Sequence, residues 1–121
     1  MAVPLVLIVD DDPAQLMLYS LVLRPLPCYI ATAPSGEAAL KLLENAHPAL
    51  LIVDILLPGM SGADVIRTIR KDAQFAPMKI VALTVVPHML AQEDTALCNV
   101  VLAKPIGVAQ LKQVIRDLLG V

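Results

Sequence analysis

Residues 5–13 read LVLIVDDDP, so that five aliphatic side chains run directly into three aspartates and a proline. A short and continuous aliphatic run is typical of a strand that is covered on both faces. Asp12 and Pro13 form a helix start, because an aspartate side chain caps free backbone amides and proline fits the first helical turn. The stretch therefore predicts a buried strand that leads at once into a helix.

This strand–helix unit recurs along the chain. Further apolar runs of strand length lie at residues 28–33, 49–53, 79–83 and 100–103. Helical patterns lie at residues 13–23, 35–46, 61–71 and 108–118, with a short helix expected within 86–99. Strands that alternate with helices predict a mostly parallel sheet with right-handed crossovers. We expect an α/β fold of five strands, with five helices on both faces of the sheet.

Length and composition limit the classes of protein to consider. A chain of 121 residues with 58% hydrophobic residues forms one domain, residues 1–121, and is not disordered. A formal charge of −2 offers no basic surface for direct nucleic-acid binding, which favours a protein partner. No run is long enough to span a membrane, and the opening residues do not resemble a signal peptide, so we expect a cytoplasmic protein with no membrane contact.

The functional side chains are expected at one edge of the sheet. In doubly wound folds they gather outside the carboxyl ends of the strands, where the strand order reverses. The expected strands end at Asp10–Asp12, Asp54, Thr84 and Lys104. Clustered carboxylates repel one another unless a cation neutralises them, and ligands that are all oxygen favour Mg²⁺, with Mn²⁺ as the alternative. A lysine and a hydroxyl beside them suit a phosphoryl group.

Four motifs carry a resemblance to a known family. They are VDDD at residues 9–12, DILLPGMSG at 54–62, LT at 83–84 and AKP at 103–105. In this order and spacing they resemble the receiver domain of bacterial response regulators, over the whole chain. The resemblance implies a flavodoxin-like sheet with the strand order 2-1-3-4-5. It also implies a signalling domain rather than an enzyme, one that catalyses only its own phosphorylation and slow autodephosphorylation.

The resemblance assigns roles to the acidic residues. Asp54 matches the aspartate that accepts a phosphoryl group from a sensor histidine kinase or a phosphotransfer protein. Magnesium would be bound by Asp11, Asp54 and the backbone carbonyl of Leu56, and Asp10 would hold a metal-bound water.

The resemblance also assigns the switch residues. Thr84 and Lys104 match the residues that bind phosphoryl oxygens, and the bond between Lys104 and Pro105 is expected to be cis. Inward movement of Thr84 would signal to the surface around the fourth helix and the fifth strand.

Two departures from the family pattern predict an atypical output face. The family usually carries an aromatic residue three positions before the lysine, where this chain has Val101, and a small residue after the threonine, where it has Val85. A pseudo-receiver that binds partners without being phosphorylated is therefore an alternative. Leu56 and Val86 are apolar where polar side chains can orient the attacking water, which predicts slow loss of the phosphoryl group.

The first helix and one motif leave two further possibilities open. Residues 16–23 are apolar almost all round the helix, so an outward face there could form a homodimer, with Tyr19 taken as an outward residue. Asp10 and Asp12, spaced by one residue after a strand, faintly resemble the opening motif of haloacid-dehalogenase-type phosphatases. A small phosphatase with an aspartate nucleophile is a less favoured alternative, because the chain has no room for the cap domain of that family.

Overall fold

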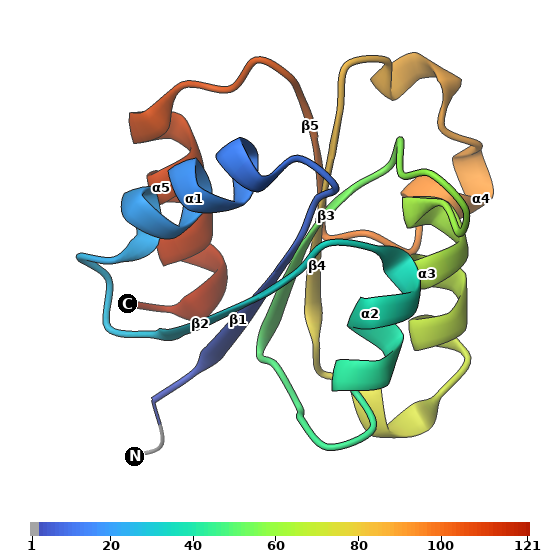
Figure 1. Cartoon of the computed structure of the whole chain (residues 1–121), viewed down its shortest axis with the longest axis horizontal. Helices are drawn as coiled ribbons and strands as arrows, with labels where there is room; N and C mark the ends of the chain where they lie inside the picture. Colours follow the sequence, from blue (N-terminus) through green and yellow to red (C-terminus); the bar gives the residue numbers. More distant parts are fainter. Residues whose placement is uncertain (1–2) are drawn as a thin grey trace.

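A parallel five-stranded sheet forms the centre of the computed structural model, which describes residues 3–121 (Figure 1). The strands are β1 (Leu5–Val9), β2 (Tyr29–Ala33), β3 (Leu50–Asp54), β4 (Lys79–Thr84) and β5 (Val100–Ala103). Their spatial order is β2-β1-β3-β4-β5, and every neighbouring pair is parallel. The predicted sheet and its strand order 2-1-3-4-5 are confirmed.

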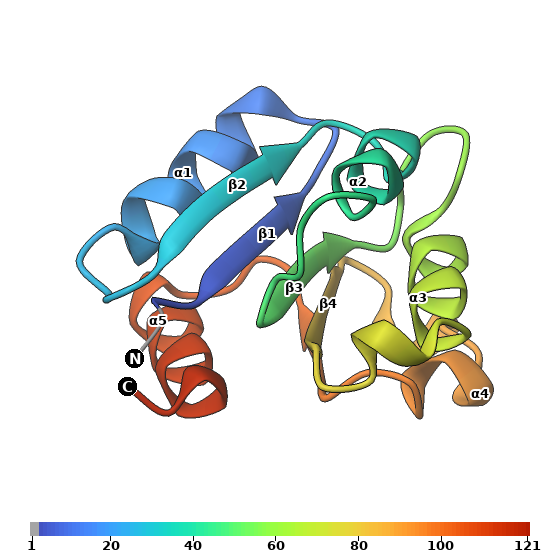
Figure 2. The same ribbon diagram turned by 90° about the horizontal axis from the view of Figure 1, so that it is seen from below.

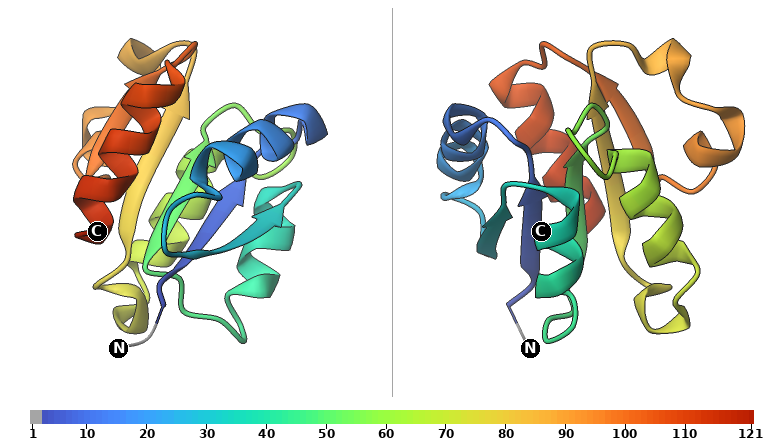
Figure 3. Two further views of the ribbon diagram at one scale, coloured as in Figure 1. Left: turned by 90° about the vertical axis from the view of Figure 1, so that its left-hand side faces the viewer. Right: turned by 45° about the vertical axis from the view of Figure 1, so that its right-hand side comes forward.

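Five helices cover the two faces of the sheet, as expected. They are α1 (Pro13–Leu23), α2 (Gly36–Leu42), α3 (Gly62–Arg70), α4 (Gln92–Thr95) and α5 (Val108–Leu119), with short 3-10 helices η1 (Ala73–Phe75) and η2 (Pro87–Met89). Helices α1 and α5 lie on one face, and α2 and α3 lie on the other, with α4 beside α3 (Figure 3). No helix within residues 3–121 combines the length and the apolar character that crossing a bilayer requires.

The core consists of two aliphatic layers, one on each face of the sheet. Along β1, Val6 and Ile8 pack toward α1 and α5, whereas Leu7 and Val9 pack toward α2 and α3. Successive strand side chains point to opposite faces, so a strand that is buried on both sides has no polar position. This arrangement explains why the strand runs are continuously apolar.

The strand order reverses beside β1, and this reversal positions the site. The chain leaves β1 for β2 on one side and later returns to place β3 on the other side (Figure 2). Val9 is in register with Val53. The residues that follow them, Asp10 and Asp54, therefore lie side by side at the carboxyl edge of the sheet. The crevice at such a reversal point is where ligands bind in folds of this class.

One helix is shorter than expected, and a second is short as expected. The predicted helix 35–46 ends at Leu42 and passes into turns, in which the amides of Glu44 and Asn45 donate to the carbonyls of Lys41 and Leu42. Within the segment 86–99, Pro87 opens only a 3-10 turn, and α4 keeps four residues with no side chain to cap its start. The length of α4 agrees with the expectation of a short helix in this segment.

The prediction that Tyr19 faces outward is wrong. Tyr19 is only 4% exposed and packs in the layer under α1, together with Val22 and Leu23. The outward face instead carries Met17 and Leu21, which are 67% and 49% exposed. A helix that is apolar all round has no polar face to show which side is buried, so periodicity could not orient it.

Candidate functional site

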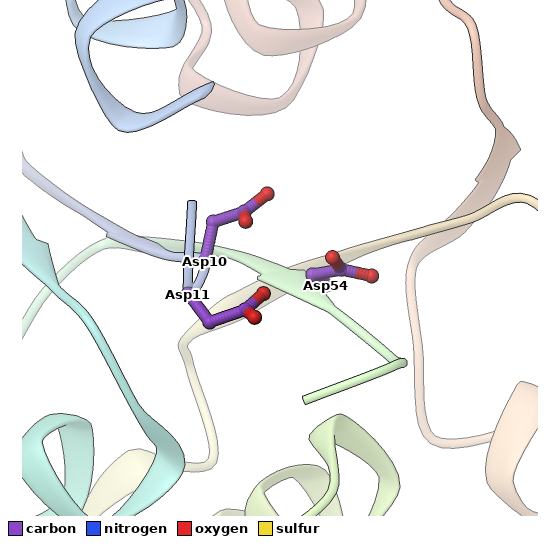
Figure 4. Close-up of side chains that lie close together, drawn as sticks. All are labelled: Asp10, Asp11 and Asp54. Atoms are coloured by element: carbon purple, nitrogen blue, oxygen red, sulfur yellow. The ribbon is translucent and has the colours of Figure 1, made fainter. Parts of the chain in front are cut away.

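A cleft of about 610 Å³ opens at the carboxyl edge of the sheet. Its polar lining includes Asp10, Asp11, Asp54 and Lys104, and Tyr19 also lines it. Asp10 and Asp11 come from the loop between β1 and α1, and Asp54 ends β3 (Figure 4). Two of the expected site residues, from one loop, therefore meet a third at the end of β3 and a fourth, Lys104, that follows β5.

The three carboxylates are close enough to share one cation. Each offers an oxygen, and these oxygens all lie within 4.8 Å of one another. Asp10 and Asp54 are buried, at 2% and 8% exposure, whereas Asp11 is exposed to solvent. Like charges at this distance favour a bound cation, and a ligand set made only of oxygen fits a magnesium ion that keeps some of its waters.

Lys104 bridges the two buried aspartates. Its Nζ atom donates to Asp54 Oδ2 at 3.0 Å and to Asp10 Oδ2 at 3.2 Å. Burial lowers the pKa of Lys104, but the hydrogen bond and the negative charge of Asp54 act in the opposite direction and raise that pKa above its ordinary value. The ammonium therefore keeps its charge in the cleft at neutral pH. The Lys104–Pro105 peptide bond is cis, as the resemblance implied.

Backbone amides orient the same two carboxylates. Asp10 Oδ1 accepts from the Asp12 amide at 2.9 Å, and Asp54 Oδ1 accepts from the Leu56 amide at 3.1 Å. Each buried carboxylate thus has one oxygen held by its own loop and the other held by Lys104. Asp12 does not join the acidic cluster, because its side chain caps α1 by accepting from the Ala14 amide at 2.9 Å.

The start of α3 packs tightly against the backbone that carries Asp54. Gly62 donates to the Ile55 carbonyl at 3.0 Å, and a Cβ atom on Gly62 would overlap the carbonyl oxygen of Asp54. Only glycine allows this approach without moving the strand end. Ser61 and Asp64 close a capping box that fixes where α3 begins.

Thr84 stands apart from the acidic cleft. It ends β4, is 1% exposed, and its Oγ1 accepts from the Val86 amide at 3.2 Å. Its side chain lines a neighbouring cavity of about 280 Å³, together with Leu56 and Val86, and it is Val85 that faces the acidic cleft. The structure brings together Asp10, Asp11, Asp54 and Lys104. The hydroxyl of Thr84 is not part of that group and is bound to the Val86 amide beside the neighbouring cavity.

An ion pair that the sequence did not reveal borders this second cavity. Arg67 on α3 donates from Nε and Nη2 to the two carboxylate oxygens of Asp94 on α4, at 2.7 and 2.6 Å. Asp94 is 4% exposed, and the hydrogen bonds from Arg67 lower its pKa despite its burial. The partners are 27 residues apart in the chain, so no local pattern marks them.

The whole arrangement suits a carboxylate that accepts a phosphoryl group. Asp54 is held in one orientation, a cationic side chain lies against it, and the acidic neighbours can hold a divalent ion beside it. Phosphoryl transfer depends mainly on such positioning and on neutralising charge.

The model of one protein family, the response regulator receiver domain, matches residues 6–116. The chain is 35% identical to the sensor histidine kinase GacS of Pseudomonas protegens over an alignment of 119 residues, which covers 93% of this chain and 13% of that protein. It is 40% identical to the transcriptional regulatory protein AfsQ1 of Streptomyces coelicolor over 81 residues, which are 67% of this chain and 35% of that protein. The chain therefore spans only a minor part of these curated relatives.

Solved structures agree with these sequence matches. The response regulator TrrA of Thermotoga maritima, in complex with Mg²⁺ and BeF, is 31% identical, with a TM-score of 0.85 over 95% of this chain and 98% of that one. The receiver domain of the sensor histidine kinase PA1611 of Pseudomonas aeruginosa has magnesium in its active-site cleft. It is 25% identical, with a TM-score of 0.86 over 99% of this chain and 100% of that one.

Proposed function

The chain belongs to the response regulator receiver domain family of two-component systems, and from this membership we propose that Asp54 accepts a phosphoryl group from a sensor histidine kinase or a histidine phosphotransfer protein. The phosphorylated domain then passes the signal on through contacts with another protein. The observation that carries this proposal is the fixed Asp54 carboxylate, with Oδ1 on the Leu56 amide and Oδ2 on Lys104, at the wall of an open cleft.

Transfer begins at the carboxylate of Asp54. One of its oxygens attacks the phosphorus atom of a phosphohistidine in line, the new P–O bond forms, and the P–N bond to the imidazole breaks. The ammonium of Lys104 then moves from the Asp54 carboxylate to the phosphoryl oxygens, which now carry the negative charge. Thr84, one strand away on β4, turns its hydroxyl toward the same oxygens. This movement draws the segment after β4 with it and changes the surface around α4 and β5.

The metal ligands in this proposal are Asp11, Asp54 and the backbone carbonyl of Leu56, with Asp10 acting through a water. The closeness of the three carboxylates supports this assignment, as does the magnesium in the structures of TrrA and of the PA1611 receiver domain. Bound there, Mg²⁺ would neutralise charge on the transferring group, and Mn²⁺ could take its place.

In this proposal the signal reaches the surface of the domain by another route than the usual aromatic side chain, because Val101 stands at that position. Val101 is half-buried in the layer that contacts α3, and valine is too short to swing between buried and exposed positions as an aromatic side chain does. The signal is instead carried by the segment of η2 and α4, which the ion pair of Arg67 and Asp94 ties to α3. The exposed apolar face of α1 supports a homodimer.

Incubation with acetyl phosphate and Mg²⁺, followed by intact-protein mass spectrometry, tests the proposal. The wild type should gain one phosphoryl group, and Asp54→Asn should gain none. Asp12→Asn is the matched control, because Asp12 caps α1 and lies outside the acidic cluster, so that variant should still be phosphorylated. A gain that persists in Asp54→Asn would place the acceptor elsewhere.

A further inference from the structure

Tyr19 brings a hydroxyl to the wall of the acidic cleft. Its ring is held in the layer between α1 and the sheet, and the residue is only 4% exposed. Every fully buried polar side-chain atom within residues 3–121 has a hydrogen-bond partner. Burial raises the pKa of the Tyr19 phenol, and a side-chain hydrogen bond with Lys104 is among the influences that lower it. Tyr19 lines the same cleft as Lys104, so its hydroxyl is within reach of the ammonium.

Lys104 has a donor left over in the same cleft. An ammonium group carries three N–H donors. Two of them are used, one on Asp54 and one on Asp10. The charge of Lys104 also acts on the Tyr19 phenol: burial raises the pKa of Tyr19, and the ammonium beside it opposes that rise. The phenol remains protonated at neutral pH, so its oxygen is a neutral acceptor next to the ammonium.

We propose that Tyr19 is a positioning residue for Lys104, whose third N–H its hydroxyl oxygen accepts both before transfer and while the ammonium turns from the Asp54 carboxylate to the incoming phosphoryl group. The inference rests on the function proposed above. A lysine has a flexible four-carbon stem, and Asp10 alone would draw its ammonium away from Asp54. The hydroxyl stands on a rigid helix and carries no charge, so it can orient the ammonium without competing with the phosphoryl oxygens for it.

The chain offers a matched pair of variants for the test, because Tyr19 and Tyr29 are its two tyrosines. Tyr29 lies on the edge strand β2 and is 65% exposed, away from the cleft. Tyr19→Phe and Tyr29→Phe each remove one hydroxyl and keep the ring. Thermal unfolding of both variants checks that the packing under α1 is preserved.

Two measurements report on Lys104. One is the initial rate of phosphorylation by acetyl phosphate with Mg²⁺. The other is the ¹⁵N NMR signal of the Lys104 ammonium, assigned with Lys104→Arg, whose proton exchange with water slows when the ammonium is hydrogen-bonded. Tyr19→Phe should lower the rate about fivefold, as expected for one hydrogen bond, and should speed the exchange. Tyr29→Phe should change neither.

A wild-type rate and an unchanged ammonium signal in Tyr19→Phe would overturn the inference. Equal slowing by Tyr19→Phe in the wild type and in Lys104→Ala would also overturn it, because the hydroxyl would then act without the lysine. If the wild type takes up no phosphoryl group, the proposed function fails, and the ammonium signal of the unphosphorylated protein still decides whether Tyr19 orients Lys104.

Discussion

Asp10 and Asp54 are oriented by the same pair of contacts, although Asp10 follows β1 and Asp54 ends β3. In each, one carboxylate oxygen accepts from the backbone amide two residues later and the other accepts from Lys104. The backbone contact costs no flexibility, because the loop is already fixed, so the acceptor is in place before a donor arrives. Asp11, which lacks these contacts and is exposed, is left free to bind a cation.

At the residue scale, the lifetime of the phosphoryl group should depend on Leu56 and Val86. Leu56 is 55% exposed and Val86 is half-buried, and neither side chain can orient an attacking water. The double variant Leu56→Asn/Val86→Glu should lose the phosphoryl group about five to thirty times faster than the wild type, the effect of one positioning hydrogen bond. The decay is followed by mass spectrometry after the phosphodonor is removed.

Leu21→Asn is the control for that prediction, since it adds the same amide to an exposed leucine on the outer face of α1. Its decay rate should equal that of the wild type. An unchanged decay rate in the double variant would show that the two positions do not control the water.

The residues of the site were predictable to different degrees. Asp10, Asp54 and Lys104 follow strand-length apolar runs, so a parallel sheet must bring them to one edge. The distance of Thr84 from the acidic cleft was not predictable, because it depends on how the hydroxyl turns at the end of β4. Tyr19 was predicted on the wrong side of its helix, since the apolar pattern of α1 has no preferred face.

At the scale of elements, α4 is held by its ion pair more than by its own helix. It has four residues and no side-chain cap, while both oxygens of the buried Asp94 are bound by Arg67 of α3. No periodicity in residues 86–99 could reveal this, because the contact joins residues that are distant in the chain. The sequence therefore predicted the strands and the longer helices better than this segment.

The ion pair of Arg67 and Asp94 makes the stability of the fold depend on pH. The hydrogen bonds from Arg67 hold the pKa of Asp94 below its ordinary value of about 3.9, so the carboxylate stabilises the fold at neutral pH. This contribution is complete above about pH 4 and is lost as the pH falls through the lowered pKa of the folded state. Asp94→Asn should unfold at a lower temperature than the wild type at pH 7, and the difference should shrink in acid.

Glu93→Gln is the control for that experiment, because Glu93 is the exposed neighbour of Asp94 on α4 and makes no such bidentate contact. Its melting temperature should follow that of the wild type at both pH values. A gap between Asp94→Asn and the wild type that stays constant from pH 7 to pH 3 would contradict the assignment.

The outer face of α1 is the second element with a testable role. Met17 and Leu21 are apolar and largely exposed there, and a face of this kind favours association with a second copy. Sedimentation should show a dimer for the wild type and a monomer for Met17→Lys/Leu21→Lys. Val108→Lys, which charges an exposed valine on α5, should leave the dimer intact. A wild type that stays monomeric at high concentration would exclude this interface.

At the scale of the whole molecule, one topological feature connects the fold to the function. The sheet order reverses beside β1, so the ends of β1 and β3 are neighbours and the loops after them open into one cleft. The two aliphatic layers that bury the strands carry the stability, while the buried polar residues Asp10, Asp54 and Thr84 lie at the carboxyl ends of the strands. The fold and the edge at which the site lies could both be predicted from the sequence, because continuous apolar strands that alternate with helices allow few other arrangements.

The most direct test of the central claim is to locate the phosphoryl group at residue level. After incubation with acetyl phosphate and Mg²⁺, borohydride reduces an aspartyl phosphate to homoserine, which tandem mass spectrometry of the digested protein assigns to one position. We predict homoserine at position 54 alone, dependent on Mg²⁺, with Asp10, Asp11 and Asp12 unmodified. Homoserine at one of those three positions, or its absence from position 54 in a folded protein, would contradict the account.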